Sequence, residues 1–189
     1  SEYDCGGVIS RTETNDKIGY MDELLFPVAS ILDPKYTFTV SKKQTAAGTA
    51  DAINHVIEQY FCGDSSILIL SIGNAPSGWP CHGIEHALSG YYDITHGEGL
   101  AIITPKWMKH ILNDKTISRF VSYGVNIFGI DKNLPSYEIA NLAIEKTYDF
   151  FKSIGIPMTL KEVGIDNSRL KEMAHHIAVN EGLENAWAP

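Results

Sequence analysis

Two pairs of potential metal ligands share the same spacing. Asp51 and His55 lie four residues apart, and His82 and His86 repeat this interval. Residues four apart on a helix lie on the same face, so both members of a pair can reach one cation. His96 follows after a short connection and begins another predicted helix. From that position it can point back towards the same place.

The mixture of ligand types indicates which cation would bind. One carboxylate with two or three imidazoles suits Zn²⁺ or Fe²⁺, whereas Ca²⁺ and Mg²⁺ prefer oxygen ligands. A single pair on a helix is more often an exposed ion pair, but two pairs and a further histidine are harder to explain in that way. The sequence therefore predicts a metal site drawn from Asp51, His55, His82, His86 and His96. We interpret the remaining histidines as hydrogen-bonded residues of the surface, namely His110, His175 and His176.

One short motif supports a different chemistry. Residues 82–86 spell H-x-x-E-H, in which both histidines of a metallopeptidase bind zinc and the glutamate, here Glu85, is the general base. This interpretation leaves Asp51, His55 and His96 without a role, and it needs a further carboxylate ligand that the sequence does not place. It remains open as an alternative.

Composition excludes several classes of partner. The chain has 189 residues, of which 44% are hydrophobic, enough for one good core. A net charge of -8 without a run of basic residues argues against nucleic acid and anionic lipid as partners. The nearly apolar run at 67–72 is too short to span a membrane. The N-terminus lacks a signal-peptide pattern, and Cys5, Cys62 and Cys81 lack C-x-x-C spacing. We expect a soluble, cytoplasmic protein without a membrane partner.

The elements that must position the candidate ligands are predicted to be mainly helical. Residues 1–35 are an exception, because β-branched clusters at 8–12 and 26–32 predict two short strands joined through a turn at 14–16. Helical periodicity begins near residue 44 and ends at Gly63. Further helices are predicted at 82–89, 97–112 with a kink at Pro105, 115–128, 136–153 and 167–180 with Asn167 as N-cap. The segment 65–72 fits a buried strand as well as a buried helix.

These segments resemble the iron-containing alcohol dehydrogenases, and their butanol dehydrogenase branch most closely. The resemblance rests on residues 48–60 (GTADAINHVIEQY), 81–97 (CHGIEHALSGYYDITHG) and 100–105 (LAIITP), and it continues to residues 180–187. It implies a two-domain enzyme with an N-terminal α/β domain that binds NAD(P). The second domain, a helical bundle of the dehydroquinate synthase-like type, would hold Fe²⁺ or Zn²⁺.

The chain is similar to this second domain only. Residues 1–35 would be a β-rich remnant of the cofactor domain and its connection, and residues 36–189 the helical metal-binding domain. By resemblance, the metal ligands are Asp51, His55, His82 and His96.

The resemblance also implies residues that serve the cofactor and the substrate. His86 would face the nicotinamide and the substrate without binding metal, and it is the candidate for relaying a proton. Ser1 and Glu2 resemble the tail of the family's phosphate-contacting Gly-Thr-Gly-Ser-Glu turn. Lys17 resembles a lysine near the cofactor ribose.

The chain also departs from the family. It lacks the glycine-rich cofactor motif, and several dozen residues would be missing near 64/65. Because the chain begins at Ser1 and not at Met, we expect it to be part of something longer. The expected function is an NAD(P)-linked dehydrogenase of primary alcohols and aldehydes, represented by its metal-binding half, which binds metal without turnover. A homodimer is the expected assembly. The first alternative is a non-catalytic metal-binding or dimerising remnant, and the second is the zinc metallopeptidase.

Overall fold

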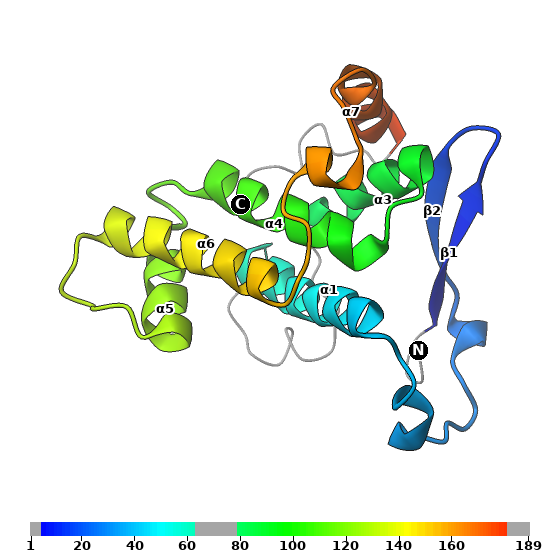
Figure 1. Ribbon diagram of the computed structural model, residues 1–189, viewed down its shortest axis with the longest axis horizontal. Coiled ribbons are helices and arrows are strands. Elements are labelled where there is room, and N and C mark those ends of the chain that lie inside the picture. Colours follow the sequence, from blue (N-terminus) through cyan, green and yellow to red (C-terminus); the bar gives the residue numbers. More distant parts are fainter. Residues whose placement is uncertain (1–4, 63–78, 181–189) are drawn as a thin grey trace.

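The computed structural model describes residues 5–62 and 79–180. Ser1, Glu2, the ambiguous segment 65–72 and the expected deletion point near 64/65 lie outside these ranges. In the described part of the chain a helical body is joined to a two-stranded hairpin, β1 (Gly6–Arg11) and β2 (Asp16–Met21) (Figure 1). The body consists of α1 (Lys42–Cys62), α3 (Pro80–Tyr92), α4 (His96–Ile111), α5 (Ile117–Phe128), α6 (Ser136–Ser153) and α7 (Leu170–Asn180). The predicted mainly helical fold with a short N-terminal β segment is confirmed.

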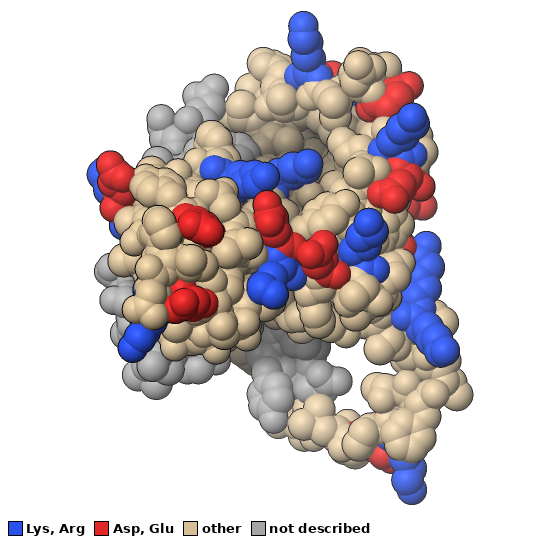
Figure 2. Space-filling model, turned by 60° about the vertical axis from the view of Figure 1, so that its left-hand side comes forward, with Lys and Arg blue, Asp and Glu red and all other residues tan. Residues whose placement is uncertain are grey.

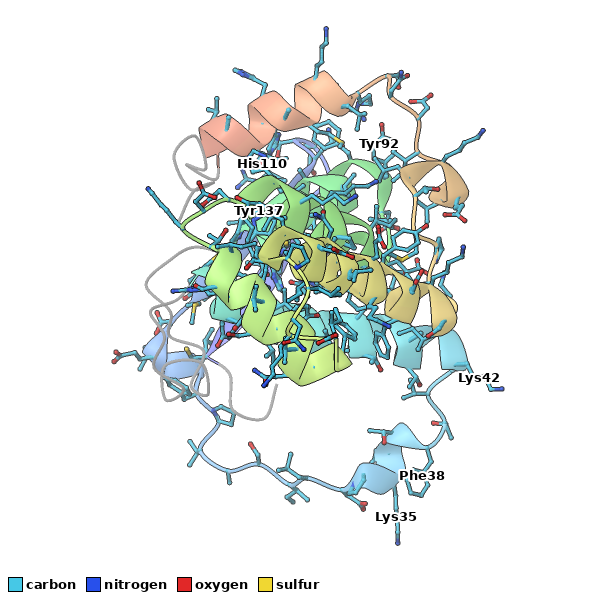
Figure 3. All side chains as sticks on the ribbon, turned by 90° about the vertical axis from the view of Figure 1, so that its left-hand side faces the viewer. Lys35, Phe38, Lys42, Tyr92, His110 and Tyr137 are labelled. Carbon is cyan, nitrogen blue, oxygen red and sulfur yellow. The ribbon has the colours of Figure 1, made fainter. Side chains whose placement is uncertain are left out.

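Short 3₁₀ turns connect these elements. They are η1 (Glu23–Leu25), η2 (Pro34–Thr37) and η3 (Leu160–Val163). Figure 3 shows Lys35 and Phe38 on the connection from the hairpin to α1, which runs away from the helical body. Phe38 is accordingly 78% exposed. None of the helices in the described ranges is both long and apolar enough to cross a membrane.

The position of the second strand was predicted wrongly. β1 agrees with the predicted strand at 8–12, but its antiparallel partner is Asp16–Met21 and not 26–32. The turn between the strands closes at Asn15, whose φ of 56° is a left-handed conformation that asparagine tolerates. Residues 26–32 form no strand, because Pro27 lacks an N–H donor and no neighbouring strand pairs with the segment.

The start of the last helix also differs from the prediction. The side chain of Asp166 accepts hydrogen bonds from the Ser168 backbone N–H at 2.9 Å and the Ser168 hydroxyl at 2.6 Å. This local turn competes with helix formation around Asn167. Consequently α7 begins at Leu170, and Asn167 is not its N-cap.

Two glycines allow the close approaches that organise the helical body. A Cβ added to Gly97, in the first turn of α4, would lie 1.9 Å from the carbonyl oxygen of Ala47 on α1. A Cβ added to Gly90 on α3 would lie 2.1 Å from the carbonyl oxygen of Asn15. Glycine at these positions therefore lets α4 cross α1 closely and lets the hairpin pack against α3.

The core lies around α4, whose residues from Gly97 to Pro105 are all buried. Phe61, Phe120 and Leu100 are fully buried within the largest apolar cluster, which joins α1, α3, α4, α5 and α6. Proline at 105 lies within α4 and does not end it. On the face shown in Figure 2, acidic and basic side chains are interspersed over the surface, so no field of one sign covers it.

Candidate metal centre

Helix α1 supplies a carboxylate and an imidazole on one face. His55 Nε2 lies 3.4 Å from Asp51 Oδ1, as their four-residue spacing predicted. The His55 side chain is about half exposed, with 47% of its surface accessible, whereas Asp51 is more covered at 33%. The pair therefore lies at the edge of the helical body, where a small molecule can reach it.

Helices α3 and α4 each add one imidazole at the same place. His82 Nε2 lies 3.6 Å from Asp51 Oδ1, and His96 Nε2 lies 3.7 Å from it. The close crossing at Gly97 brings the first turn of α4 to α1. An ion pair of 3.2 Å between Lys43 and Glu98 joins the starts of the same two helices. Three imidazoles from three helices thus surround one carboxylate oxygen.

The donor set fits a tetrahedrally coordinated cation, and the ligand atoms of Asp51, His55 and His82 lie within 4.8 Å of one another. Ligand atoms about 2.0–2.1 Å from a zinc ion would lie about 3.3–3.4 Å from one another, close to the separations around Asp51 Oδ1. In addition, Asp51 Oδ1 and His82 Nε2 are buried without a hydrogen-bond partner. Buried polar atoms of this kind are costly unless something binds them. A divalent cation would satisfy both atoms.

The electrostatics of the site also favour a cation. Burial alone would raise the pKa of Asp51, but His82, His55 and His96 outweigh it and hold the pKa below its usual value. Burial alone would lower the pKa of His82, but the carboxylates of Asp51 and Glu58 raise it to about 9. Without metal, His82 is therefore protonated at neutral pH, and binding a cation at Nε2 must release a proton. For His55, burial and the nearby His82 lower the pKa.

Two glutamates behind the histidines were missed as parts of the site. Glu58 Oε2 is hydrogen-bonded to His82 Nδ1, and Glu85 Oε2 is hydrogen-bonded to His96 Nδ1. Glu58 lies seven residues after Asp51 and three after His55 on α1, so helical spacing could have identified it. For Glu85 the sequence predicts only the role of a peptidase base.

The environment of Glu85 does not support a peptidase. Its side chain is fully buried, and it also accepts a hydrogen bond from the Ser89 hydroxyl. A general base must reach a water molecule at the metal, whereas both oxygens of Glu85 are already engaged by His96 and Ser89. The metallopeptidase alternative is therefore not favoured.

His86 lies beside the ligand cluster. Its ring centroid is 5.7 Å from that of His96 and 6.4 Å from that of His82. A ligand atom of His86 also lies within 4.8 Å of ligand atoms of Glu85 and His96. Burial lowers the pKa of His86 to about 4, and the nearby His96 and Lys17 act in the same direction. His86 is therefore neutral at pH 7.

Two further residues flank the site. Lys17 lies on β2, half-buried, and its charge acts on His86 across the contact between the hairpin and α3. Trp79, which precedes α3, packs edge-on against His55 and His82 at ring distances of 5.0 and 5.3 Å. Trp79 could not be predicted from the sequence as part of the site, because a lone tryptophan carries no spacing signal.

The other histidines lie elsewhere. His176 on α7 pairs with Asp16 at 2.9 Å, which holds α7 against the hairpin. The neighbouring Tyr91 carries the guanidinium of Arg169 on its ring at 4.2 Å. His110 lines an apolar cavity of about 630 Å³ between α3, α4 and α7, to which none of the candidate ligands contributes. Figure 3 shows His110 below α7.

The amino-acid sequence matches a known family over most of its length. Residues 65–188 match the family model described as "Fe-containing alcohol dehydrogenase family, C-terminal". The chain is 45% identical to NADH-dependent butanol dehydrogenase A of Clostridium acetobutylicum over 225 aligned positions, which cover 96% of this chain and 58% of that protein. It is 33% identical to a probable NADH-dependent butanol dehydrogenase 1 of Bacillus subtilis, covering 95% of this chain and 57% of that protein.

Solved structures share the fold. NADH-dependent butanol dehydrogenase A from Thermotoga maritima superimposes with a TM-score of 0.85 at 30% identity, over 94% of this chain and 55% of that one. YqhD of Escherichia coli superimposes with a TM-score of 0.80 at 26% identity, over 93% of this chain and 55% of that one. The chain thus spans little more than half the length of the relatives that it matches.

Proposed function

Because the chain belongs to the Fe-containing alcohol dehydrogenase family, we propose that it provides the metal centre of an NAD(P)-linked alcohol dehydrogenase. The proposed ligands are Asp51, His55, His82 and His96. The observation that carries this proposal is the position of three imidazole Nε2 atoms 3.4–3.7 Å from Asp51 Oδ1.

The proposed cation is Fe²⁺ or Zn²⁺, since both accept this ligand set. When bound, such a cation supplies Lewis acidity that polarises an alcohol or carbonyl oxygen. Asp51 contributes the single negative charge among the four ligands and so offsets part of the charge of the cation. His55, which is half exposed, lies on the side from which a substrate can approach.

His86 is proposed to serve the proton transfer that accompanies alcohol oxidation. It lies next to His96 and is neutral at pH 7, so one ring nitrogen can accept a hydrogen bond while the other donates one. We propose that Lys17 contacts the cofactor ribose and that Ser1 and Glu2 contact its phosphates. The position of Lys17 near His86 supports the first of these assignments. Hydride chemistry belongs to the nicotinamide itself.

The proposed substrates are primary alcohols and aldehydes, as the names of the butanol dehydrogenase relatives suggest. We further propose that residues 36–189 are the metal-binding domain and residues 1–35 the end and connection of a cofactor domain. The clostridial relative aligns over 225 positions, more than the 189 residues of this chain. This excess supports an internal shortening near 64/65.

Exposed apolar side chains support a homodimer as the oligomeric form. Leu24, Val28 and Ile31 are each more than 90% exposed on the connection between the hairpin and α1. Apolar surface of this kind is commonly covered by a partner. Light scattering that gives twice the 20.9 kDa chain mass would support the dimer, and a monomer would contradict it.

Metal content tests the proposed function. We expect about one Fe or Zn per chain by elemental mass spectrometry, and loss of that metal in His96→Ala. His175→Ala is the matched control, because His175 is exposed on α7 and should keep the metal. Retention of metal in His96→Ala, or its absence from the unaltered chain, would contradict the proposal.

A further inference from the structure

We propose that Glu58 is a positioning residue that holds His82 in the one tautomer able to bind a cation through Nε2. This inference rests on the proposed metal centre and adds to it a residue that touches no metal. Glu58 is 1% exposed on α1, and its Oε2 is hydrogen-bonded to His82 Nδ1 on α3. The atom of His82 nearest to Asp51 Oδ1 is Nε2, at 3.6 Å.

Each oxygen of Glu58 has its own partner. Oε1 accepts a hydrogen bond of 2.5 Å from the backbone N–H of Cys81. A backbone N–H can only donate, so this bond fixes the orientation of the carboxylate. The other oxygen of an ionised carboxylate can only accept. His82 Nδ1 must therefore carry a hydrogen. The lone pair of Nε2 is then available to bind a cation.

Glu85 makes a similar contact with His96, but its second partner is adaptable. The Ser89 hydroxyl donates to Glu85 Oε1 and also lies 3.2 Å from the carbonyl oxygen of Ile94. A hydroxyl can accept as well as donate. If residue 85 were glutamine, its side-chain oxygen could still accept a hydrogen bond from His96 Nδ1. Its amide group could donate to the Ser89 hydroxyl oxygen, because the Ser89 hydrogen could turn to the carbonyl oxygen of Ile94.

Glutamine at position 58 cannot satisfy both of its neighbours in this way. If its oxygen accepts from Cys81, its amide faces His82 Nδ1 and favours the tautomer with hydrogen on Nε2, where the cation should bind. If its oxygen turns to His82, its amide faces the Cys81 N–H, and two donors meet in a buried place. The chain therefore offers two isosteric substitutions, Glu58→Gln and Glu85→Gln, that should differ in effect.

Calorimetric titration of the full 189-residue chain with Co²⁺ tests this difference. Loss of a partner behind a ligating histidine typically weakens metal binding about 10–100-fold, and we expect a loss of this size for Glu58→Gln. Glu85→Gln should weaken binding by less than about tenfold. Equal affinity of Glu58→Gln and the unaltered chain, or equal losses in both variants, would overturn the proposal.

Two controls separate this proposal from others. A purely structural role of Glu58 would lower the thermal stability of the metal-free variant and leave the Co²⁺ affinity unchanged. His82→Ala tests the centre itself: if it binds Co²⁺ as the unaltered chain does, both proposals fail. If only His82→Ala loses affinity and Glu58→Gln does not, the metal centre stands and the role of Glu58 is wrong.

A measurement on the unaltered chain covers the case in which Glu58→Gln does not fold. In the Zn²⁺-loaded chain, nitrogen-15 NMR of the imidazoles should find a hydrogen-bonded proton on His82 Nδ1. A proton on Nε2 of His82 would overturn the proposal.

Discussion

The single carboxylate of Asp51 is the common neighbour of three histidines from three helices. His55, His82 and His96 each direct Nε2 to within 3.7 Å of Asp51 Oδ1. Like charges would repel if all three imidazoles were protonated. The negative charge of Asp51 offsets this repulsion, and a cation that replaced the protons would stabilise the cluster further.

Loss of a residue that is hydrogen-bonded to a metal ligand typically weakens metal binding about 10–100-fold. Because Asp51 is a proposed ligand itself, Asp51→Asn should weaken Zn²⁺ binding by more than this. Asparagine keeps the shape of the side chain but removes its charge. Titration calorimetry measures the change. Asp93→Asn is the matched control, because Asp93 is exposed and has a left-handed φ of 52° that asparagine also tolerates. Unchanged affinity in Asp51→Asn would show that Asp51 is not a ligand.

His86 should make the metal-free chain less stable in mild acid. Its folded-state pKa of about 4 lies below its unfolded value of 6.5, so only the unfolded chain binds a proton between these values. The contribution of neutral His86 is present above about pH 6.5 and is lost as the pH falls towards 4. Urea unfolding with a chelator present should show a smaller loss of stability between pH 7 and 5 in His86→Gln. If the free energy of unfolding changed equally with pH in the variant and in the unaltered chain, the lowered pKa of His86 would be contradicted.

Among the helices and strands, helical periodicity predicted the helices well, whereas the partner of the first strand was predicted wrongly. The helix predicted at 136–153 is present at those residues as α6, because its apolar positions follow the 3.6-residue period closely. The second strand was misplaced, since Lys17 and Gly19 in β2 carry no strong strand signal and pairing is decided by the partner. The contact of Glu58 with His82 depends on how α1 packs on α3, which the spacing within one helix does not reveal.

The close crossing of α1 and α4 should depend on glycine at position 97. Gly97→Ala would place a methyl group against the Ala47 carbonyl oxygen, and overpacking of this kind costs about 1–3 kcal/mol. Because His96 precedes Gly97, metal affinity should fall as well. Gly48→Ala is the control: its Cβ would meet nothing within 4 Å on α1, and alanine there should stabilise the chain by about 0.5–1 kcal/mol. Chemical unfolding of both variants tests this, and equal stabilities would contradict it.

For the whole molecule, the proposed metal centre belongs to a chain that spans only 58% of its clostridial relative. We expect the purified 189-residue chain to bind Fe²⁺ or Zn²⁺ and to oxidise no NADH in the presence of butanal, because these residues match only 58% of the length of the NADH-dependent relative. Absorbance of NADH measures the reaction. Steady turnover that rises with chain concentration would refute this expectation.

Anomalous diffraction from crystals of the chain soaked in Zn²⁺ would locate the cation and its ligands. We expect one strong peak about 2.0–2.2 Å from Asp51 Oδ1 and from the Nε2 atoms of His55, His82 and His96. A peak bound by His86, or one bound by Glu85 in place of Asp51, would contradict it.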